Sequence, residues 1–317
     1  MHIAIIGAGS VGLLLAGKLA ASGAARITVV TRAKEQADAL NEKGITVTSG
    51  RASARGNVTA IPFAVWSSSQ ALELPYDWVF LTVKQQAIDS LMLNALGAMN
   101  RPVNGLVCWQ NGVGHIERIA DVFPLDRIYI AVTTEGARRL ALSEVAHTGT
   151  GHTELGAAAG QVLDNASQPM QKILEGLLNQ AGFQASVSKH IVSSIWYKLL
   201  VNAVVNPLTA LVRKPNGELL ASDETATLIR SLAKEGLSVA LAEGAELDED
   251  SVLRRIQDVC RRTADNRSSM LQDVDAGRRT ENEWVSGAVA RLAAKHGLSV
   301  PATETIYRII REWERGR

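Results

Sequence analysis

The chain has 317 residues, more than one hydrophobic core usually organises, so we expect two domains of ordinary size. An apolar fraction of 46% and a charged fraction of 21% are typical of globular proteins and exclude a largely disordered chain. Because 33 basic residues are balanced by 32 acidic ones, the charge gives no indication of a nucleic-acid partner. Cys108 and Cys260 lie far apart and outside any CxxC or Cys/His cluster, so we expect neither a disulfide framework nor a metal site.

The amino terminus and the longest apolar run bear on localisation. The chain is apolar from residue 3, but its start lacks the charged segment and small-residue cleavage site of a signal peptide. The apolar stretch 199–212 contains two asparagines and a proline, and it is shorter than the roughly 18 residues that span a bilayer. We therefore expect a cytoplasmic protein without a membrane partner.

The first half of the chain alternates short β-branched runs with amphipathic stretches, a pattern typical of βαβ units and a parallel sheet. A helix is expected at 11–21, between the first two strands. The segment 41–62 is rich in Gly, Thr and Ser and predicts hairpin strands or loops inserted into this pattern. The expected strands of the sheet are 2–6, 26–31, 78–83, 105–109 and 128–134.

The strand signal nearly vanishes after residue 190. A strand at 152–158, a helix at 168–180 and a short apolar run at 183–187 come before this change. The fold class expected is therefore α/β, a Rossmann-type doubly wound parallel sheet in residues 1–187, followed by an all-helical domain in residues 188–317. The expected helices of the second domain are 191–212, 222–243, 249–274, 278–296 and 303–314.

A glycine motif, GAGSVG, stands directly after the first expected strand and opens the first expected helix. This is the dinucleotide fingerprint, in which two glycines allow a tight turn and close approach of the pyrophosphate, and the third lets helix and strand pack. The amino terminus of the helix offers unpaired N–H groups and a positive dipole end to the phosphates. The residues expected to bind the cofactor here are Gly7, Ala8, Gly9, Ser10, Val11 and Gly12.

The residue after the second strand indicates which dinucleotide binds. Enzymes that bind NAD or FAD carry Asp or Glu at this place, where the carboxylate accepts a hydrogen bond from the ribose 2′-hydroxyl. This chain has Arg32 instead. A guanidinium cannot accept that hydrogen bond, but it can donate a charge-assisted pair to a 2′-phosphate. We therefore expect NADPH as the cofactor, the alternative being a solvated arginine at a strand end.

Lys84 and Asn111 follow the next two strands, in TVK and QNGVG. Residues that follow parallel strands lie at the same edge of the sheet and face a bound cofactor. Lys84 could contact the ribose or a substrate carboxylate, and Asn111 could bind the nicotinamide side or the substrate. Because Asn-Gly is also a common turn dipeptide, a purely structural role for Asn111 stays open.

The segment 196–210, WYKLLVNAVVNPLTA, places polar side chains on an otherwise apolar helix. Lys198, Asn202 and Asn206 are spaced by four residues and so share one helix face. A buried amide or ammonium group costs several kcal/mol if it is unpaired, so this stripe must line a wet pocket or form a satisfied polar seam. Pro207 is expected to loosen the helix where the stripe ends, because it disfavours α geometry at Asn206.

Longer motifs then follow in a specific order. NRSSMLQD occupies 266–273 and RRTE occupies 278–281. Together with the glycine motif, Arg32, TVK, QNGVG, the segment 196–210 and RKPNGEL at 213–219, they resemble the ketopantoate reductase (2-dehydropantoate 2-reductase) family over essentially the whole chain. The resemblance implies NADPH-dependent reduction of 2-dehydropantoate to (R)-pantoate. A reductase of another small 2-keto acid, a related β-hydroxyacid dehydrogenase and a cofactor-binding redox sensor without turnover stay open.

The same resemblance implies roles for individual residues. Lys198 would be the catalytic acid, and Glu281 would hold both this lysine and the substrate hydroxyl. Asn202 and Asn206 would bind the substrate, and Ser269 would hold its carboxylate. Asn266 lies three residues before Ser269 on the same helical side, and this spacing, rather than the resemblance, makes it a weaker substrate contact. No histidine pair has the spacing of a metal site. A small 2-keto acid is the expected partner, and a homodimer is a candidate assembly.

Overall fold

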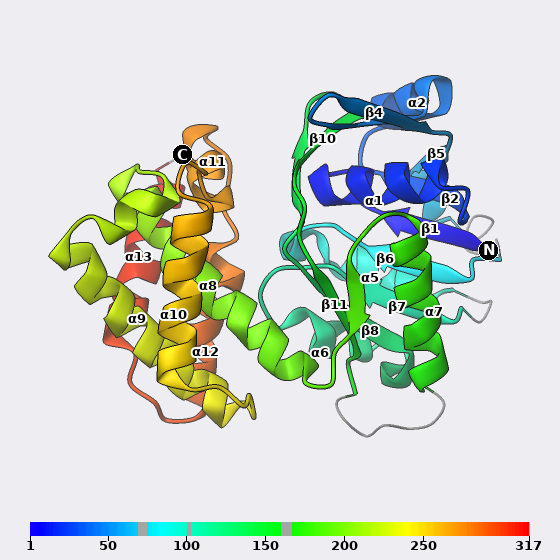
Figure 1. The fold of residues 1–317 in the computed structure, drawn as a ribbon. Helices are drawn as coiled ribbons and strands as arrows, with labels where there is room; N and C mark the ends of the chain where they lie inside the picture. Colours follow the sequence, from blue (N-terminus) through cyan, green and yellow to red (C-terminus); the bar gives the residue numbers. More distant parts are fainter. Residues whose placement is uncertain (69–74, 100–102, 160–166, 317) are drawn as a thin grey trace. The chain divides into compact units, whose positions relative to one another are not determined.

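The computed structural model describes residues 1–68, 75–99, 103–159 and 167–316. The chain forms two compact units, each described here by itself (Figure 1). The first unit comprises Met1–Gln110 and His115–Ile191, and the second comprises Asn111–Gly114 and Val192–Arg317. The division after Ile191 lies close to the boundary expected between residues 187 and 188, and the short loop 111–114 groups with the second unit.

The first unit contains an eight-stranded sheet in the order β12-β11-β8-β7-β6-β1-β2-β5. Neighbouring strands are parallel except for β8 and β11, which pair antiparallel. The expected Rossmann-type sheet is confirmed. Its strands are β1 (His2–Ile6), β2 (Arg26–Thr31), β5 (Thr59–Pro62), β6 (Trp78–Leu81), β7 (Gly105–Cys108), β8 (Ile128–Thr133), β11 (Thr153–Ala157) and β12 (Ala185–Val187).

Strand β1 shows why this sheet lies between helical layers. Ile3 and Ile5 belong to one apolar cluster, whereas Ala4 and Ile6 belong to another, as the alternation of side chains along a strand requires. Both faces are thus buried, which is typical of parallel sheets with helical crossovers. The first cluster includes residues of α1 (Ser10–Ala21), and the second includes residues of α5 (Ser90–Gly97) and α6 (His115–Ala120). The other helical segments of this unit are α2 (Lys34–Lys43), α3 (Phe63–Trp66), η1 (Gln85–Ala87), η2 (Leu125–Arg127) and α7 (Ser167–Gln180).

A second, four-stranded sheet in the order β4-β3-β10-β9 packs on α1. Its strands are β3 (Ile45–Ser49), β4 (Ala52–Gly56), β9 (Gly136–Arg139) and β10 (Glu144–Gly149). Contact with α1 is close, because a Cβ added at Gly17 would lie 2.4 Å from the Val47 side chain. The hairpin expected within 41–62 is confirmed as β3 and β4, whereas β5 joins the main sheet beside β2.

The second unit is helical, as expected (Figure 1). Two of the predicted helices are wrong in extent. The segment 249–274 is broken, because the first helix ends at Arg262, where Thr263 departs from helical geometry. A new helix begins only after Ser268, whose hydroxyl caps it by accepting a hydrogen bond from Leu271 N–H. The segment 278–296 is α-helical only in its second part, because Val285 departs from helical geometry. The helices are α8 (Ile191–Val212), η3 (Asn216–Leu220), α9 (Asp223–Ala242), α10 (Glu249–Arg262), α11 (Ser269–Asp275), η4 (Asn282–Trp284), α12 (Ser286–Lys295) and α13 (Pro301–Arg315).

Helix α8 continues through Pro207 to its end at Val212, so the proline does not end the helix at Asn206. The residues around Pro207 are held in the core of the second unit, where Val204, Val205 and Leu208 are buried. By length and composition α8 could also cross a membrane. Half of its most apolar window is buried in the protein, however, which is typical of a core helix.

The close packing of Gly12 gives a test of the fold. A Cβ added at Gly12 would lie 1.9 Å from the carbonyl oxygen of Gly7, whereas one added at Gly9 would meet no atom within 4 Å. We expect Gly12→Ala to lower the free energy of unfolding by about 1–3 kcal/mol, because the backbone must shift to admit the methyl group. Chemical denaturation of this variant, with Gly9→Ala as the matched control, measures the effect. Equal stability of the two variants would contradict the packing described.

Candidate active site

The turn between β1 and α1 forms an open cradle at the start of a helix. Gly7 has a φ of 115°, which favours glycine, and its N–H donates to the Val30 carbonyl at 2.9 Å. The Thr82 hydroxyl donates to the Gly7 carbonyl at 2.8 Å and fixes the turn from the neighbouring strand. Gly9 is exposed, faces open space and gives α1 no side-chain cap. These residues fit a phosphate group of a dinucleotide, because helix N–H groups stay available to it.

The remaining residues of the glycine motif contribute mainly backbone. Ala8 is buried, and Val11 packs against the core, so neither side chain faces the cradle. Ser10 differs, because its Oγ accepts a hydrogen bond from the backbone N–H of Arg139 at 3.1 Å. Sequence reasoning missed this link between the glycine motif and the small sheet, since the two segments are far apart in the chain.

Arg32 and Lys84 lie where the sequence predicted them, directly after β2 and close after β6, and both are exposed. These strands flank β1 in a parallel arrangement, so both residues are at the sheet edge that carries the glycine turn. The segment before Lys84 is held by Gln110, whose side-chain amide donates to the carbonyls of Leu81 and Val83 at 2.8 and 3.1 Å. Gln110 therefore has a structural role beside Asn111.

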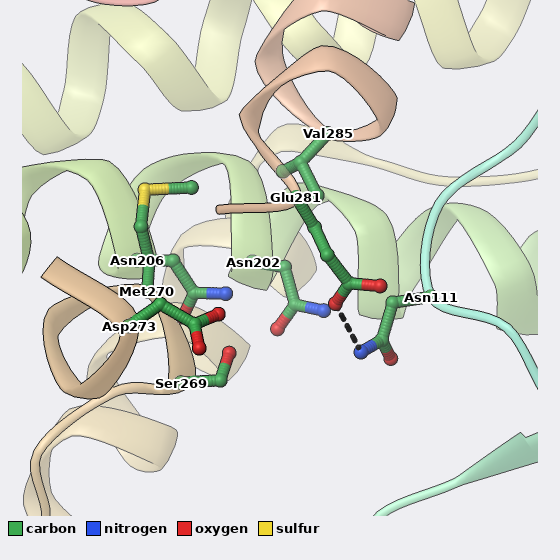
Figure 2. Close-up of a pocket in the computed structure, with 8 residues that line it drawn as sticks. All are labelled: Asn111, Asn202, Asn206, Ser269, Met270, Asp273, Glu281 and Val285. Atoms are coloured by element: carbon green, nitrogen blue, oxygen red, sulfur yellow. Dashed lines mark hydrogen bonds between the residues drawn. The ribbon is translucent and has the colours of Figure 1, made fainter. Parts of the chain in front are cut away.

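The second unit contains a small polar pocket (Figure 2). Helix α8 contributes two amides, α11 contributes a hydroxyl and a carboxylate, and the loop 111–114 contributes a third amide. Such a set of hydrogen-bonding groups suits a small, highly oxygenated molecule. The lining residues are Asn111, Asn202, Asn206, Ser269, Met270, Asp273, Glu281 and Val285.

Asn111 lies beside Glu281 at one side of this pocket, its side-chain N–H donating to Oε2 of Glu281 at 3.3 Å (Figure 2). The following Gly112 has a φ of 80°, so the Asn-Gly pair forms a turn and also presents the Asn111 side chain to the pocket. Turn chemistry and a side chain that lines the pocket thus occur together at Asn111, and its contact with a ligand stays a prediction. Glu281 is held by its neighbours: the Thr280 hydroxyl donates to Glu314 at 2.6 Å, and the Asn282 amide donates to the Tyr307 carbonyl at 3.0 Å.

The start of α11 is tied to α8 by a buried contact. The hydroxyl oxygens of Ser268 and Thr209 lie 2.7 Å apart and form a hydrogen bond that connects the start of α11 to α8. Because Ser268 caps α11, the same contact fixes Ser269 at the first helical position, where its side chain reaches the pocket. Ser269 therefore lies opposite the amides of α8, as Figure 2 shows.

Lys198 lies one turn before Asn202 on the same face of α8, outside the residues that line the pocket. The residue is partly buried as a whole, but its ammonium group is desolvated. Burial lowers the pKa of Lys198 to about 8, and the negative charge of Glu281 opposes that decrease. The lysine and the glutamate, 83 residues apart in sequence, therefore interact electrostatically within this unit.

Two features of the pocket differ from the sequence analysis. Asn266 lies in the loop before α11 and is exposed, so its expected position on one helix side with Ser269 is wrong; Ser268 starts the helix after it. Asp273 was missed, although it lies four residues after Ser269, the spacing of one helix face. It is buried, and Arg278 Nε pairs with its carboxylate at 2.9 Å.

Comparison with known proteins assigns the chain to a family. The model of "Ketopantoate reductase PanE/ApbA" matches residues 3–160, and that of "Ketopantoate reductase PanE/ApbA C terminal" matches residues 190–314. The 2-dehydropantoate 2-reductase of Bacillus subtilis (strain 168) is 34% identical, over 99% of this chain and 98% of the relative. The chain belongs to the ketopantoate reductase family. It is therefore an oxidoreductase, and the resemblance found in its motifs is confirmed.

Solved structures of the ketopantoate reductase family and of similar enzymes share this fold. A probable 2-dehydropantoate 2-reductase from Bacillus subtilis matches with a TM-score of 0.81 and 31% identity, covering 98% of this chain and 99% of the other. The ternary structure of D-mandelate dehydrogenase with NADH and anilino(oxo)acetate matches with a TM-score of 0.88 and 24% identity, covering 100% of this chain and 99% of the other. At that identity the second likeness concerns the fold alone.

The charge of Glu281 can be tested through Lys198. Because the carboxylate raises the pKa of the lysine against the effect of burial, we expect Glu281→Gln to lower that pKa further below about 8. Reductive methylation with ¹³C followed by an NMR titration measures the pKa, and Lys198→Arg identifies the signal. A pKa that rises or stays constant in Glu281→Gln would contradict the interaction.

Proposed function

We propose that this protein reduces 2-dehydropantoate to (R)-pantoate with NADPH, as in pantothenate and coenzyme A biosynthesis, and that Lys198 is the general acid. The observation that carries the proposal is the desolvated ammonium of Lys198, which lies on the helix face of the pocket amides Asn202 and Asn206. The negative charge of Glu281 partly compensates the desolvation of this ammonium. Membership of the ketopantoate reductase family supports the substrate class, since relatives such as the Bacillus subtilis protein are named for this substrate.

The pocket would bind the parts of the keto acid that do not react. The Ser269 hydroxyl donates to the carboxylate, and the amides of Asn202 and Asn206 supply further hydrogen bonds to oxygen atoms of the substrate. Asn111, which contacts Glu281, would bind the substrate or the nicotinamide from the side of the pocket where Glu281 lies. Asn266 is retained only as a weaker contact, because it lies in an exposed loop outside the pocket lining.

The chemistry places negative charge on the carbonyl oxygen. A nicotinamide cofactor held at the glycine turn would supply the hydride for the carbonyl carbon. Lys198 donates a proton to the carbonyl oxygen, which becomes the hydroxyl of the product. A pKa of about 8 leaves most of the lysine protonated at neutral pH and brings its acidity close to the working pH, as an efficient proton donor requires. Glu281 keeps the ammonium charged and oriented.

In the first unit, the glycine turn would hold the pyrophosphate, and Arg32 would bind the 2′-phosphate that distinguishes NADPH from NADH. The exposed guanidinium directly after β2 suits this role, because it offers several donors to a phosphate in a fixed geometry. Lys84, exposed after β6, would contact the ribose or the substrate carboxylate. A cytoplasmic location and a homodimeric assembly belong to the same proposal.

The substrate and the cofactor are tested with the purified wild-type protein. We expect rapid oxidation of NADPH with 2-dehydropantoate and slower oxidation with 2-ketoisovalerate, while β-hydroxyacids are not turned over. In Arg32→Ala, loss of a charge-assisted contact at an exposed site should weaken the binding of NADPH by about 10-fold and leave the affinity for NADH unchanged. Equal loss for both cofactors, or a wild-type preference for NADH, would rule out the role of Arg32. Cofactor binding without keto-acid-dependent oxidation would instead identify a sensor.

The acid is tested by replacing Lys198. Lys198→Ala should lower turnover by about 10²- to 10⁴-fold while NADPH still binds, and Lys198→Arg should recover little because a guanidinium is a poor proton donor. In the wild type, turnover should decrease above about pH 8 as the ammonium deprotonates. The matched control is Lys214→Ala, which removes an exposed lysine just after the end of the same helix and should leave turnover unchanged. Near-normal turnover in folded Lys198→Ala would refute the mechanism.

A further inference from the structure

Strand β9 of the small sheet contacts α1 and reaches its first residue. The backbone N–H of Arg139, the last residue of β9, donates to Oγ of Ser10 at 3.1 Å. Ser10 is the residue at which α1 begins, directly after the open cradle at Gly9. The backbone of Arg139 is therefore attached to the turn that would hold the phosphates of a dinucleotide.

The register of β9 against β10 determines on which face the Arg139 side chain lies. Arg139 is directly opposite Val145, which is fully buried in the cluster that contains the apolar residues of α1. Ala137, two residues before Arg139, packs against the same cluster. Side chains of directly opposed residues and of residues two apart in a strand share a face. Arg139 therefore stands on the face of β9 that is turned toward α1.

Arg138 lies on the other face. It is opposite Ala146, one position along from Val145, and successive side chains of a strand point to opposite sides. Arg138 and Arg139 are both exposed and carry the same charge. The two adjacent arginines thus differ in the face of β9 on which they stand: Arg139 is on the face turned toward α1, and Arg138 is on the opposite face.

The turn after β9 is fixed to the glycine motif by a second connection. The side-chain amide of Gln36, in α2, donates to the carbonyl of Ala8 and to the carbonyl of Leu142, each at 3.0 Å. Gln36 is itself buried. Ser10 thus fixes the last residue of β9, and Gln36 fixes the turn that follows it, so the backbone of Arg139 is attached to the glycine motif through two connections.

The charge of Arg139 is available to an anion. Within the ranges 1–68, 75–99, 103–159 and 167–316, the Arg139 guanidinium has no ion-pair partner. The helix terminus beside it carries a partial positive charge and no acidic residue in its first turn. A guanidinium and a helix amino terminus together favour an anionic group between them, and their mutual repulsion is relieved when one binds.

We propose that Arg139 is a further binding residue of the cofactor site and that its guanidinium pairs with the pyrophosphate of the dinucleotide. The proposal rests on the nicotinamide dinucleotide of the proposed function and adds to it a contact that is common to NADPH and NADH. The backbone of Arg139 is attached to the first residue of α1, whereas Arg32 follows β2 and would meet the 2′-phosphate. Arg139 thus contributes affinity, whereas Arg32 contributes the preference for NADPH.

Direct binding measurements test this assignment without turnover. NADPH and NADH are titrated separately into wild type, Arg139→Ala and Arg138→Ala, in the absence of keto acid, and the nicotinamide fluorescence reports the Kd. We expect Arg139→Ala to bind both cofactors about 10-fold more weakly, the value for one charge-assisted hydrogen bond at an exposed site. Arg138→Ala should stay within about twofold of wild type, and the affinity of Arg139→Ala should depend less on salt concentration.

The outcomes distinguish this proposal from the proposed function. Wild-type protein that binds neither cofactor would refute the proposed function itself. Wild-type binding with equal Kd values for Arg139→Ala and Arg138→Ala would overturn the role of Arg139 alone. Loss of NADPH but not of NADH in Arg139→Ala would also overturn it, because the contact would then be to the 2′-phosphate. Thermal unfolding and the variant Arg139→Gln show whether any loss reflects the charge or the fold.

Discussion

The second unit is built around an ammonium group on a helix that also forms its core. One side of α8 is buried through Leu199, Val204 and Leu208, whereas Lys198 stands on the side that carries the pocket amides. A desolvated charge is costly unless an opposite charge or hydrogen-bonding groups compensate it. Glu281 provides that compensation from a segment anchored on α13, and the loop 111–114 contributes the amide that holds Glu281. Glu281, which lines the polar pocket, thus also compensates the charge of Lys198 next to that pocket on α8.

The same desolvation links the stability of the protein to its chemistry. The pKa of Lys198 is about 8 in the folded protein and 10.5 without burial, so between these values the unfolded chain binds more protons than the folded one. The contribution of this group to stability therefore rises with pH through that window, and below about pH 8 the folded state carries the full cost of the buried charge. At neutral pH, where the acid is charged and ready to donate, the fold is penalised by it, as expected for a group retained for chemistry.

Elements with a continuous local pattern could be predicted from the sequence to their ends, as the strands His2–Ile6 and Arg26–Thr31 and the helix Ile191–Val212 show. Errors arose where helix ends interrupted the pattern. Helix α10 ends at Arg262, so Asn266 lies in a loop and not on the helix face of Ser269. Ser268 then caps α11, on which Asp273 lines the pocket. The amide of Asn111 could be placed at a strand end, but its contact with Glu281 joins residues 170 positions apart, which no local pattern contains.

The small sheet shows the same limit more sharply. Strand β10 pairs with β3, about a hundred residues earlier, so neither the sheet nor its packing on α1 is visible in a local pattern. In the sequence, Arg138 and Arg139 are equivalent. A shift of one residue in the β9–β10 register would exchange their faces, because the side-chain period of a strand is two. On β9 itself, Ala137 packs against the cluster that contains α1, and the Arg139 N–H donates to Ser10 Oγ, and both contacts oppose that shift. The packing of β9 on α1 therefore decides which of the two arginines stands on the face turned toward that helix.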